Sequence, residues 1–167
     1  MLTSLSRFVA KSAQHALPLF KVQQKEAAFE WTEECEQALQ HLKKELSEPS
    51  VLSRPDDEQV LYLNLAVASE AVIAAFIRET TEGQKPIYFT SKALKGPKIR
   101  YQLIEKVALA LVNAARRLSH YFLAHTIVVR TNQPIKPLLG RPDMAGRMLK
   151  WSLELSEFDI RYESRKA

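Results

Sequence analysis

The feature that most constrains the fold is a long amphipathic segment between Leu103 and Phe122. Its apolar residues recur at helical spacing and share one face: Ile104, Val107, Ala108, Leu111, Ala115, Leu118 and Phe122. The opposite face carries polar and basic side chains: Lys106, Asn113, Arg116, Arg117 and His120. This pattern predicts a long helix that buries its apolar stripe against another element of the same domain.

The element beneath that helix is predicted to be a sheet, because runs rich in β-branched and aliphatic residues stand on both sides of it. Three runs with short links precede the helix, at Val60–Val67, Ala71–Arg78 and Pro86–Ser91, and they favour an antiparallel meander. A fourth run, Thr126–Thr131, follows the helix, and a helical crossover normally places such a strand parallel to an earlier one. We expect Val60–Val67 to be central, paired with Ala71–Arg78 and parallel to Thr126–Thr131.

One more strand and a late helix complete the predicted architecture. Phe158, Ile160 and Tyr162 alternate as in a last strand, and Ala145–Leu155 has the periodicity of a helix. The apolar stripe of the long helix should pack on the sheet through Val107, Leu111 and Leu118. The sequence therefore predicts an α/β fold, with a mixed five-stranded sheet and flanking helices.

The segment before the first strand is predicted to be a helical extension. Residues 1–28 are compatible with short helices interrupted by a proline, and they should form an appendage. Thr32 reads as a helix N-cap, because an acidic first turn and an apolar stripe follow it, and this helix should end before Pro49. We therefore divide the chain into a helical segment, 1–48, and a second domain, 49–167.

Composition excludes several classes of protein. The chain has 167 residues, of which 46% are hydrophobic and 26% charged, as in a soluble globular protein. No apolar run approaches the roughly 20 residues needed to span a bilayer, and no secretion signal is recognised, so we expect no membrane partner. The single cysteine excludes an internal disulfide, and the four histidines do not have zinc-site spacing. We expect a reducing setting, cytoplasmic or nuclear.

Charge is distributed unevenly along the chain. The stretch from Gly83 to Pro142 contains eleven Lys or Arg residues and one acid, whereas Glu30 to Glu82 contains twelve acids and four Lys or Arg residues. A long basic stretch indicates contact with a polyanion such as nucleic acid. The predicted nucleic-acid-binding residues are Lys92, Lys95, Lys98, Arg100, Arg116, Arg117 and Arg130. The alternative is that these charges are spread around the molecule as solvated surface charge.

Several segments, in the same order, resemble the polyproteins of gypsy-type LTR retrotransposons. Phe29–Cys35 is similar to the linker helix of that family, and Pro49–Leu52 to the proline turn after it. Glu105–Lys106 resembles part of the long helix in the family's RNase-H-like domain, and Val129–Thr131 resembles its next strand. Residues 1–28 resemble the end of the reverse transcriptase thumb. The resemblance covers nearly the whole chain, and it implies a thumb-end segment followed by an RNase-H-like domain of the connection type.

The resemblance also implies where the catalytic acids of an RNase H would stand. Such an enzyme needs about four carboxylates that hold two magnesium ions at the scissile phosphate. The family positions that carry three of these acids correspond here to Val67, Val107 and Asn132, and the fourth would lie beyond the last residue. Glu70 and Glu105 are close in sequence, but strand and helix geometry turns both away from those positions. We therefore predict no catalytic residues, no metal ligands and no cofactor.

The role implied by the resemblance is that of a degenerate RNase H domain that holds an RNA/DNA hybrid or other duplex. Its expected partners are that duplex and the rest of a reverse transcriptase polyprotein. Two alternatives stay open. One is an active metal-dependent RNase H, which would bring three carboxylates together at one point. The other is a host-encoded protein-interaction module, which would show an exposed apolar patch in place of a basic one.

Overall fold

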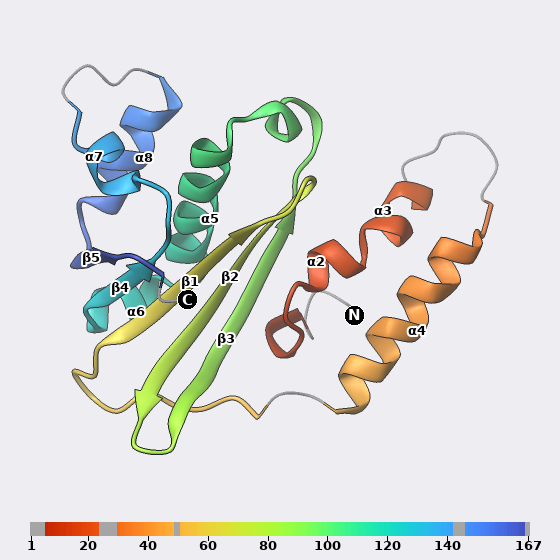
Figure 1. Cartoon of the computed structure of the whole chain (residues 1–167), viewed down its shortest axis with the longest axis horizontal. Helices are drawn as coiled ribbons and strands as arrows, with labels where there is room; N and C mark the ends of the chain where they lie inside the picture. Colours follow the sequence, from red (N-terminus) through yellow and green to blue (C-terminus); the bar gives the residue numbers. More distant parts are fainter. Residues whose placement is uncertain (1–5, 24–29, 49–50, 142–145, 166–167) are drawn as a thin grey trace.

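A computed structural model describes residues 6–23, 30–48, 51–141 and 146–165, and its centre is a five-stranded sheet with the order β3-β2-β1-β4-β5 (Figure 1). The strands are β1 (Leu61–Val67), β2 (Ala71–Thr80), β3 (Gly83–Ala93), β4 (Ile127–Arg130) and β5 (Ile160–Glu163). β2 is antiparallel to both β1 and β3, whereas β4 is parallel to both β1 and β5. The predicted α/β class, the mixed sheet and the central position of the first strand are confirmed. Two predicted features, the turn at Pro49 and the start of a helix at Ala145, lie outside the described residues.

The hairpin between β2 and β3 is longer than the sequence predicted. β3 begins at Gly83 and not at Pro86, and its ladder with β2 continues to the pair Thr80–Gly83. Gly83 has a φ of 118°, which residues with a side chain rarely adopt and which permits the tight turn. Pro86 cannot donate a ladder hydrogen bond, and the register shifts between Phe76 and Ile77, opposite this proline. Because proline is unusual inside a strand, the sequence pattern predicts a strand that begins at Pro86, three residues after its actual start at Gly83.

The predicted long helix is two helices in the structure. α5 (Leu103–Arg117) ends at Leu118, whose backbone is non-helical with φ −120° and ψ 33°, and α6 (Ser119–Ala124) follows. The prediction of one helix as far as Phe122 is therefore wrong. Leu118 and Phe122 are nevertheless both buried. Because only Leu118 departs from helical geometry, the apolar residues before and after it still face the core. Hydrophobic periodicity therefore does not reveal the break between α5 and α6.

The main hydrophobic core lies between α5 and the sheet. α5 crosses one face of the sheet over β1 and β2, and its Val107 and Leu111 pack in one cluster with Leu63 and Phe76. Leu118 belongs to the same cluster, so the predicted packing of the helix on the sheet is confirmed. Burying an apolar side chain of this size stabilises the folded state by about 1.5–3 kcal/mol relative to leaving it exposed.

Three shorter helices extend the layer formed by α5: η2 (Gly96–Arg100), α7 (Ile135–Leu139) and α8 (Arg147–Leu155). α8 lies against α5, and its Trp151 and Leu155 are buried in the main core. In the described ranges of the chain, no helix combines the length and the apolarity needed to cross a bilayer.

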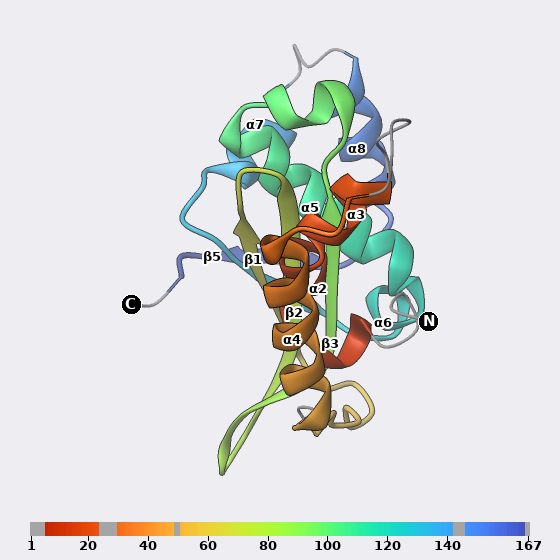
Figure 2. The ribbon, with the colours of Figure 1, turned by 90° about the vertical axis from the view of Figure 1, so that its right-hand side faces the viewer.

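The described part of the N-terminal segment forms helices on the β3 side of the sheet, the first two of which contact β3 (Figure 2). They are η1 (Ser6–Phe8), α2 (Ser12–His15), α3 (Leu17–Gln23) and α4 (Glu33–Ser47). Thr32 caps α4 as predicted, because its Oγ1 accepts a hydrogen bond from the backbone N–H of Cys35 at 3.3 Å.

Contacts with β3 attach the predicted appendage to the sheet. The Ser12 and Ser91 hydroxyls share a hydrogen bond of 2.8 Å, and the backbone N–H of Ala13 donates to the Ser91 Oγ at 2.7 Å. A small second core between these helices contains Val9, Ala16 and Leu42. The division into 1–48 and 49–167 stays a prediction, with a separate apolar cluster on each side of it.

Candidate nucleic-acid interface

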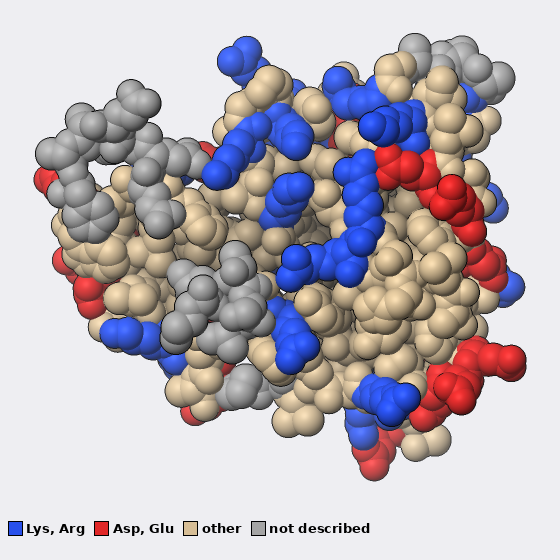
Figure 3. Space-filling view, turned by 180° about the vertical axis from the view of Figure 1, so that it is seen from behind, with Lys and Arg blue, Asp and Glu red and all other residues tan. Residues whose placement is uncertain are grey.

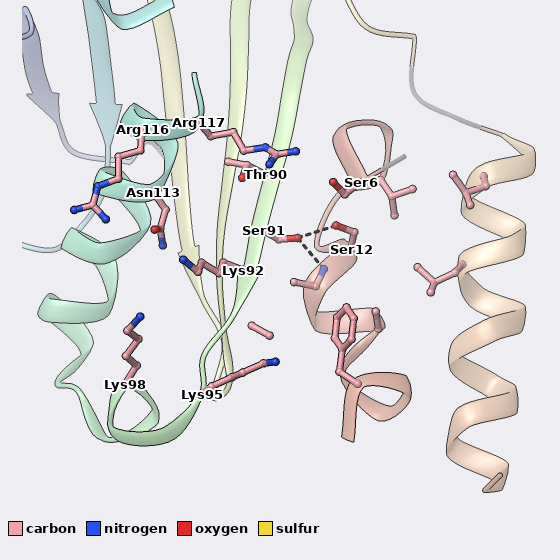
Figure 4. Close-up of a pocket in the computed structure, with 17 residues that line it drawn as sticks. Ser6, Ser12, Thr90, Ser91, Lys92, Lys95, Lys98, Asn113, Arg116 and Arg117 are labelled. Carbon is pink, nitrogen blue, oxygen red and sulfur yellow. Dashed lines mark hydrogen bonds between the residues drawn. The ribbon is translucent and has the colours of Figure 1, made fainter. Parts of the chain in front are cut away.

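Basic side chains gather around a hollow that lies between the N-terminal helices on one side and β3, η2 and α5 on the other (Figures 3 and 4). The hollow is a cavity of about 760 Å³. Five of the seven residues predicted to bind nucleic acid line it: Lys92, Lys95, Lys98, Arg116 and Arg117. The described residues of its lining include no acid. We call this cavity, with its five cations, the basic hollow.

Three neighbouring elements bring these cations together. Lys92 lies at the end of β3, Lys98 lies in η2, and Arg116 and Arg117 lie in the last turn of α5. η2 connects β3 to α5, so residues that are distant in sequence face one cavity. Figure 4 shows Lys92 extending from β3 toward Asn113 of α5, and Lys98 pointing from η2 toward the same region.

The opposite wall of the basic hollow is apolar. Its side chains come from the N-terminal segment and α4: Val9, Ala13, Ala16, Phe20, Leu42 and Leu46. The hydrogen bond between Ser12 and Ser91 ties this wall to β3. One wall can therefore contact hydrocarbon or an aromatic ring while the other contacts an anion.

The cations of the basic hollow differ in what neutralises them. Arg116 donates two hydrogen bonds to Glu154 of α8, at 2.7 and 2.8 Å, and this carboxylate raises the pKa of the Arg116 guanidinium. The other four cations have no carboxylate partner among the described residues. Partial burial lowers the pKa of Lys92, and the positive charges of Lys98 and Arg116 lower it further. Positive charge is thus concentrated here with little compensation.

The two remaining predicted residues lie elsewhere. Arg100 is exposed in η2 and does not line the basic hollow. Arg130 is only 9% exposed: its guanidinium lies 3.8 Å from the centre of the Tyr62 ring and pairs with Glu79 at 2.8 Å and Glu163 at 3.5 Å. The prediction that Arg130 binds nucleic acid is therefore not carried into the basic hollow, because Arg130 does not line it and its charge is paired within the fold. No local pattern predicts this pairing, since both acids are distant from Arg130 along the chain.

The positions expected to carry catalytic acids lie at one edge of the sheet. Because β1 and β4 are parallel, their carboxyl ends are at the same edge, where Val67 ends β1 and Asn132 follows β4. Val107 of α5 is buried in the main core, and Val67 packs against that core. The Oδ1 of Asn132 accepts a hydrogen bond from the backbone N–H of Arg165 at 3.1 Å.

The two nearby carboxylates are engaged in other contacts. Glu70 pairs with Lys21 at 2.8 Å. Glu105 accepts a hydrogen bond from the backbone N–H of Gln102 at 3.0 Å, at the start of α5, and pairs with Arg147 at 2.6 Å. Among the residues that the structure describes, no three His, Cys, Asp or Glu side chains are grouped so that they could hold a metal ion.

One residue of the basic hollow was not singled out in the sequence. Asn113 was predicted only to lie on the polar face of the long helix. In the structure its Nδ2 is buried, has no hydrogen-bond partner among the described residues, and lines the hollow beside Lys92. Helical periodicity could not reveal this, because the surfaces that bury Asn113 come from other segments.

The sequence matches a known family and several polyproteins. Residues 31–129 match the family described as the RNase H-like domain found in reverse transcriptase. The retrovirus-related Pol polyprotein from transposon 412 of Drosophila melanogaster is 24% identical over 161 residues, which cover 96% of this chain and 13% of that protein. The transposon Tf2-3 polyprotein of Schizosaccharomyces pombe is 25% identical over 174 residues, which cover 96% of this chain and 12% of that protein. The chain therefore spans about an eighth of the length of these relatives.

The fold is similar to that of part of the foamy viral protease-reverse transcriptase. The dRH form in complex with double-stranded DNA has a TM-score of 0.80 and 18% identity, and the match covers 99% of this chain and 30% of that one. The complex with an RNA/DNA hybrid has a TM-score of 0.77 and 20% identity, covering 99% and 24%. These likenesses show the RNase H-like fold, and the resemblance to retrotransposon polyproteins is confirmed. The chain belongs to the family of RNase H-like domains found in reverse transcriptases.

Proposed function

We propose that this chain is a structural module of a reverse transcriptase polyprotein and that it contacts an RNA/DNA hybrid, or another duplex, along the basic hollow. The observation that carries the proposal is the gathering of Lys92, Lys95, Lys98 and Arg117 at one place, without carboxylate partners in the described structure. Such a cluster can neutralise several backbone phosphates, and the duplex then releases its bound counterions. The foamy viral complexes with double-stranded DNA and with an RNA/DNA hybrid, which share the fold, support a duplex ligand.

The expected contacts are to the phosphate backbone. Lysine and arginine side chains around a hollow can reach phosphates without reading base edges, so binding should be indifferent to sequence. The logarithm of the binding constant should fall with the logarithm of salt concentration, by about 0.9 for each phosphate neutralised on duplex DNA.

A charge-reversal variant tests the interface. The variant carries Lys95→Glu, Lys98→Glu and Arg117→Glu, and it leaves the ion pair between Arg116 and Glu154 intact. We expect its affinity for a fluorescent RNA/DNA hybrid to fall by about tenfold or more at low salt, with a shallower salt slope. Anisotropy titrations at several salt concentrations measure both quantities.

The matched control changes the same charge at exposed lysines outside the hollow: Lys43→Glu, Lys44→Glu and Lys136→Glu. We expect this control to retain the parent affinity within about threefold, because only long-range charge is altered. Equal losses in the two variants would show that net charge, and not the basic hollow, governs binding.

We further propose that the chain does not cleave the hybrid. The proposal is supported by Val67, Val107 and Asn132 at the positions expected to carry catalytic acids, and by the engagement of Glu70 and Glu105 in ion pairs with Lys21 and Arg147. Purified protein should release no labelled product from a hybrid in Mg²⁺ or Mn²⁺ above a blank without protein. Cleavage that follows the protein through a second purification and stops on chelation would overturn this proposal.

A second candidate function, a protein-interaction module, is favoured by two exposed leucines on one face of α8. Leu149 and Leu153 are 44% and 62% exposed and are spaced by one helical turn. If α8 serves only protein contacts, Leu149→Glu with Leu153→Glu leaves hybrid affinity unchanged. Loss of hybrid binding in that variant would move the duplex interface from the basic hollow to α8.

A further inference from the structure

The geometry points to a seat for one nucleotide inside the basic hollow, with the phosphate against Lys92, Lys98 and Asn113 and the base against the apolar wall. The seat shares Lys92 and Lys98 with the proposed duplex contacts, but it lies inside a cavity of about 760 Å³ that a double helix cannot enter. A free nucleotide, or the terminal nucleotide of a strand, can enter it. Cavities of roughly 300–1,000 Å³ are typical of sites for small organic ligands.

The phosphate end of the seat is defined by donors that lack an acceptor. The Nδ2 of Asn113 is buried without a partner in the described structure, and such a donor costs about 1–3 kcal/mol until an acceptor reaches it. Lys92 extends to the same place, with Lys98 directed toward it. After a small rotation of the Asn113 side chain, a phosphate oxygen would accept a hydrogen bond from the amide and lie between the two ammonium groups.

The state of Lys92 supports an anionic ligand at this position. Partial desolvation lowers the pKa of Lys92, and the positive charges of Lys98 and Arg116 lower it further. The carboxylate of Glu154 already accepts two hydrogen bonds from Arg116. A dianion in the seat would relieve the repulsion between these cations, so the site is arranged for a ligand that brings its own negative charge.

The base end of the seat is apolar and fixed in place. Phe20, Leu42 and Leu46 line it, and an aromatic ring can pack against them. The hydrogen bonds of Ser91 to Ser12 and to the Ala13 backbone hold this wall against β3. A ligand with both a phosphate and a flat apolar ring therefore fits better than either part alone.

Calorimetric titration of the full chain with AMP, adenosine and inorganic phosphate tests the seat. We expect AMP to bind about tenfold tighter, or more, than either adenosine or phosphate, because only AMP reaches both ends. The variants Asn113→Leu and Lys92→Met should each weaken AMP binding by about tenfold, whereas Lys136→Met should leave it unchanged. Two separate variants guard against misfolding of one, and thermal unfolding identifies a variant that does not fold.

A second set of ligands distinguishes the two sources of the nucleotide. A hybrid with a one-nucleotide 5′-phosphorylated overhang is compared with the same hybrid ended bluntly. If the overhang hybrid binds more tightly than the blunt hybrid, and Asn113→Leu removes this difference, the seat takes the ends of strands. If AMP binds but the overhang adds no affinity, the seat takes free nucleotides. If neither AMP nor the overhang gains affinity from Asn113, the seat does not exist.

The test of the nucleotide seat can fail or succeed independently of the proposal that the chain binds a duplex. Asn113→Leu should keep the parent affinity for the blunt hybrid, because that affinity depends on the cations of the basic hollow and not on Asn113. Wild-type protein that binds AMP but not the blunt hybrid would sink the duplex proposal alone.

Discussion

Two of the positions expected to carry acids, Val67 at the end of β1 and Val107 in α5, pack in or against the core, and Arg130 of β4 is paired with two glutamates. Beside β3, four cations of the same sequence stretch line an open cavity without a carboxylate partner in the described structure. We call the first region the closed side, defined by Val67, Val107 and Arg130. The second is the basic hollow. Both regions belong to one small sheet, yet charge is removed or paired in one and left uncompensated in the other.

This difference indicates which region supports folding and which is available to a ligand. Uncompensated charges of like sign lower the stability of a folded protein, whereas apolar burial raises it. The closed side should therefore tolerate a new charge poorly. The basic hollow should tolerate a new negative charge well. Three substitutions test this contrast.

The largest effect is expected for Val107→Glu on the closed side. Val107 is 4% exposed and packs within the main hydrophobic core, so we expect a loss of about 4 kcal/mol in the free energy of unfolding. The control Val107→Ala removes the same packing without adding charge and should cost about 2 kcal/mol. Chemical denaturation measures both. A glutamate no worse than alanine would mean that this end of the sheet is open to water.

Arg130→Met should have an intermediate effect. It removes the contacts with Glu79, Glu163 and the Tyr62 ring, but because both glutamates are nearly half exposed we expect a loss of only about 1.5 kcal/mol at neutral pH. The comparison on the other side is Lys95→Met, which should change stability by less than about 0.5 kcal/mol. Equal losses would contradict the contrast between the two regions.

The effect of Arg130 should depend on pH in a defined direction. The hydrogen bond from Arg130 lowers the pKa of Glu79 in the folded state. This contribution to stability is therefore present above the usual glutamate pKa and is lost as the pH falls through the lowered value. The difference between the parent and Arg130→Met should shrink in acid, which denaturation at a series of pH values would show.

Asn113→Asp should have the smallest effect, and its sign should be opposite to that of Val107→Glu. The new carboxylate lies beside Lys92, so we expect a gain of about 0.5 kcal/mol in stability at neutral pH. The same carboxylate repels phosphate, and AMP binding should be lost. A destabilised variant would show that the cations of the basic hollow are neutralised by some other means.

Local pattern predicted the elements well and their long-range contacts less well. β1, β2 and α5 follow from runs and stripes that each segment carries alone, and the capping of α4 follows from Thr32. The contact between Ser12 and Ser91 joins residues separated by 79 positions, and neither residue has a pattern that marks it. The basic hollow depends on this contact, so the sequence could predict its cations but not the cavity.

The same limit explains the different outcomes for the predicted basic residues. Lys92, Lys95 and Lys98 are neighbours in sequence, and η2 folds them toward α5. Along the chain, Arg130 is one more cation of the same basic stretch as these lysines. Its partners Glu79 and Glu163 lie on β2 and β5, and no pattern within a single segment shows that these side chains meet Arg130 across the sheet.

The position of the N-terminal helices has a consequence for self-association. β3 is the last strand on its side of the sheet, and an uncovered edge strand offers its free backbone groups to a strand of another molecule. η1 and α2 lie along this edge, while the opposite edge is formed by β5, which has only four residues. A shorter chain that began at residue 49 would expose the longer edge. Such a chain should form dimers or fibres by pairing between exposed β3 strands. The N-terminal helices therefore protect the protein from aggregation, in addition to forming one wall of the basic hollow.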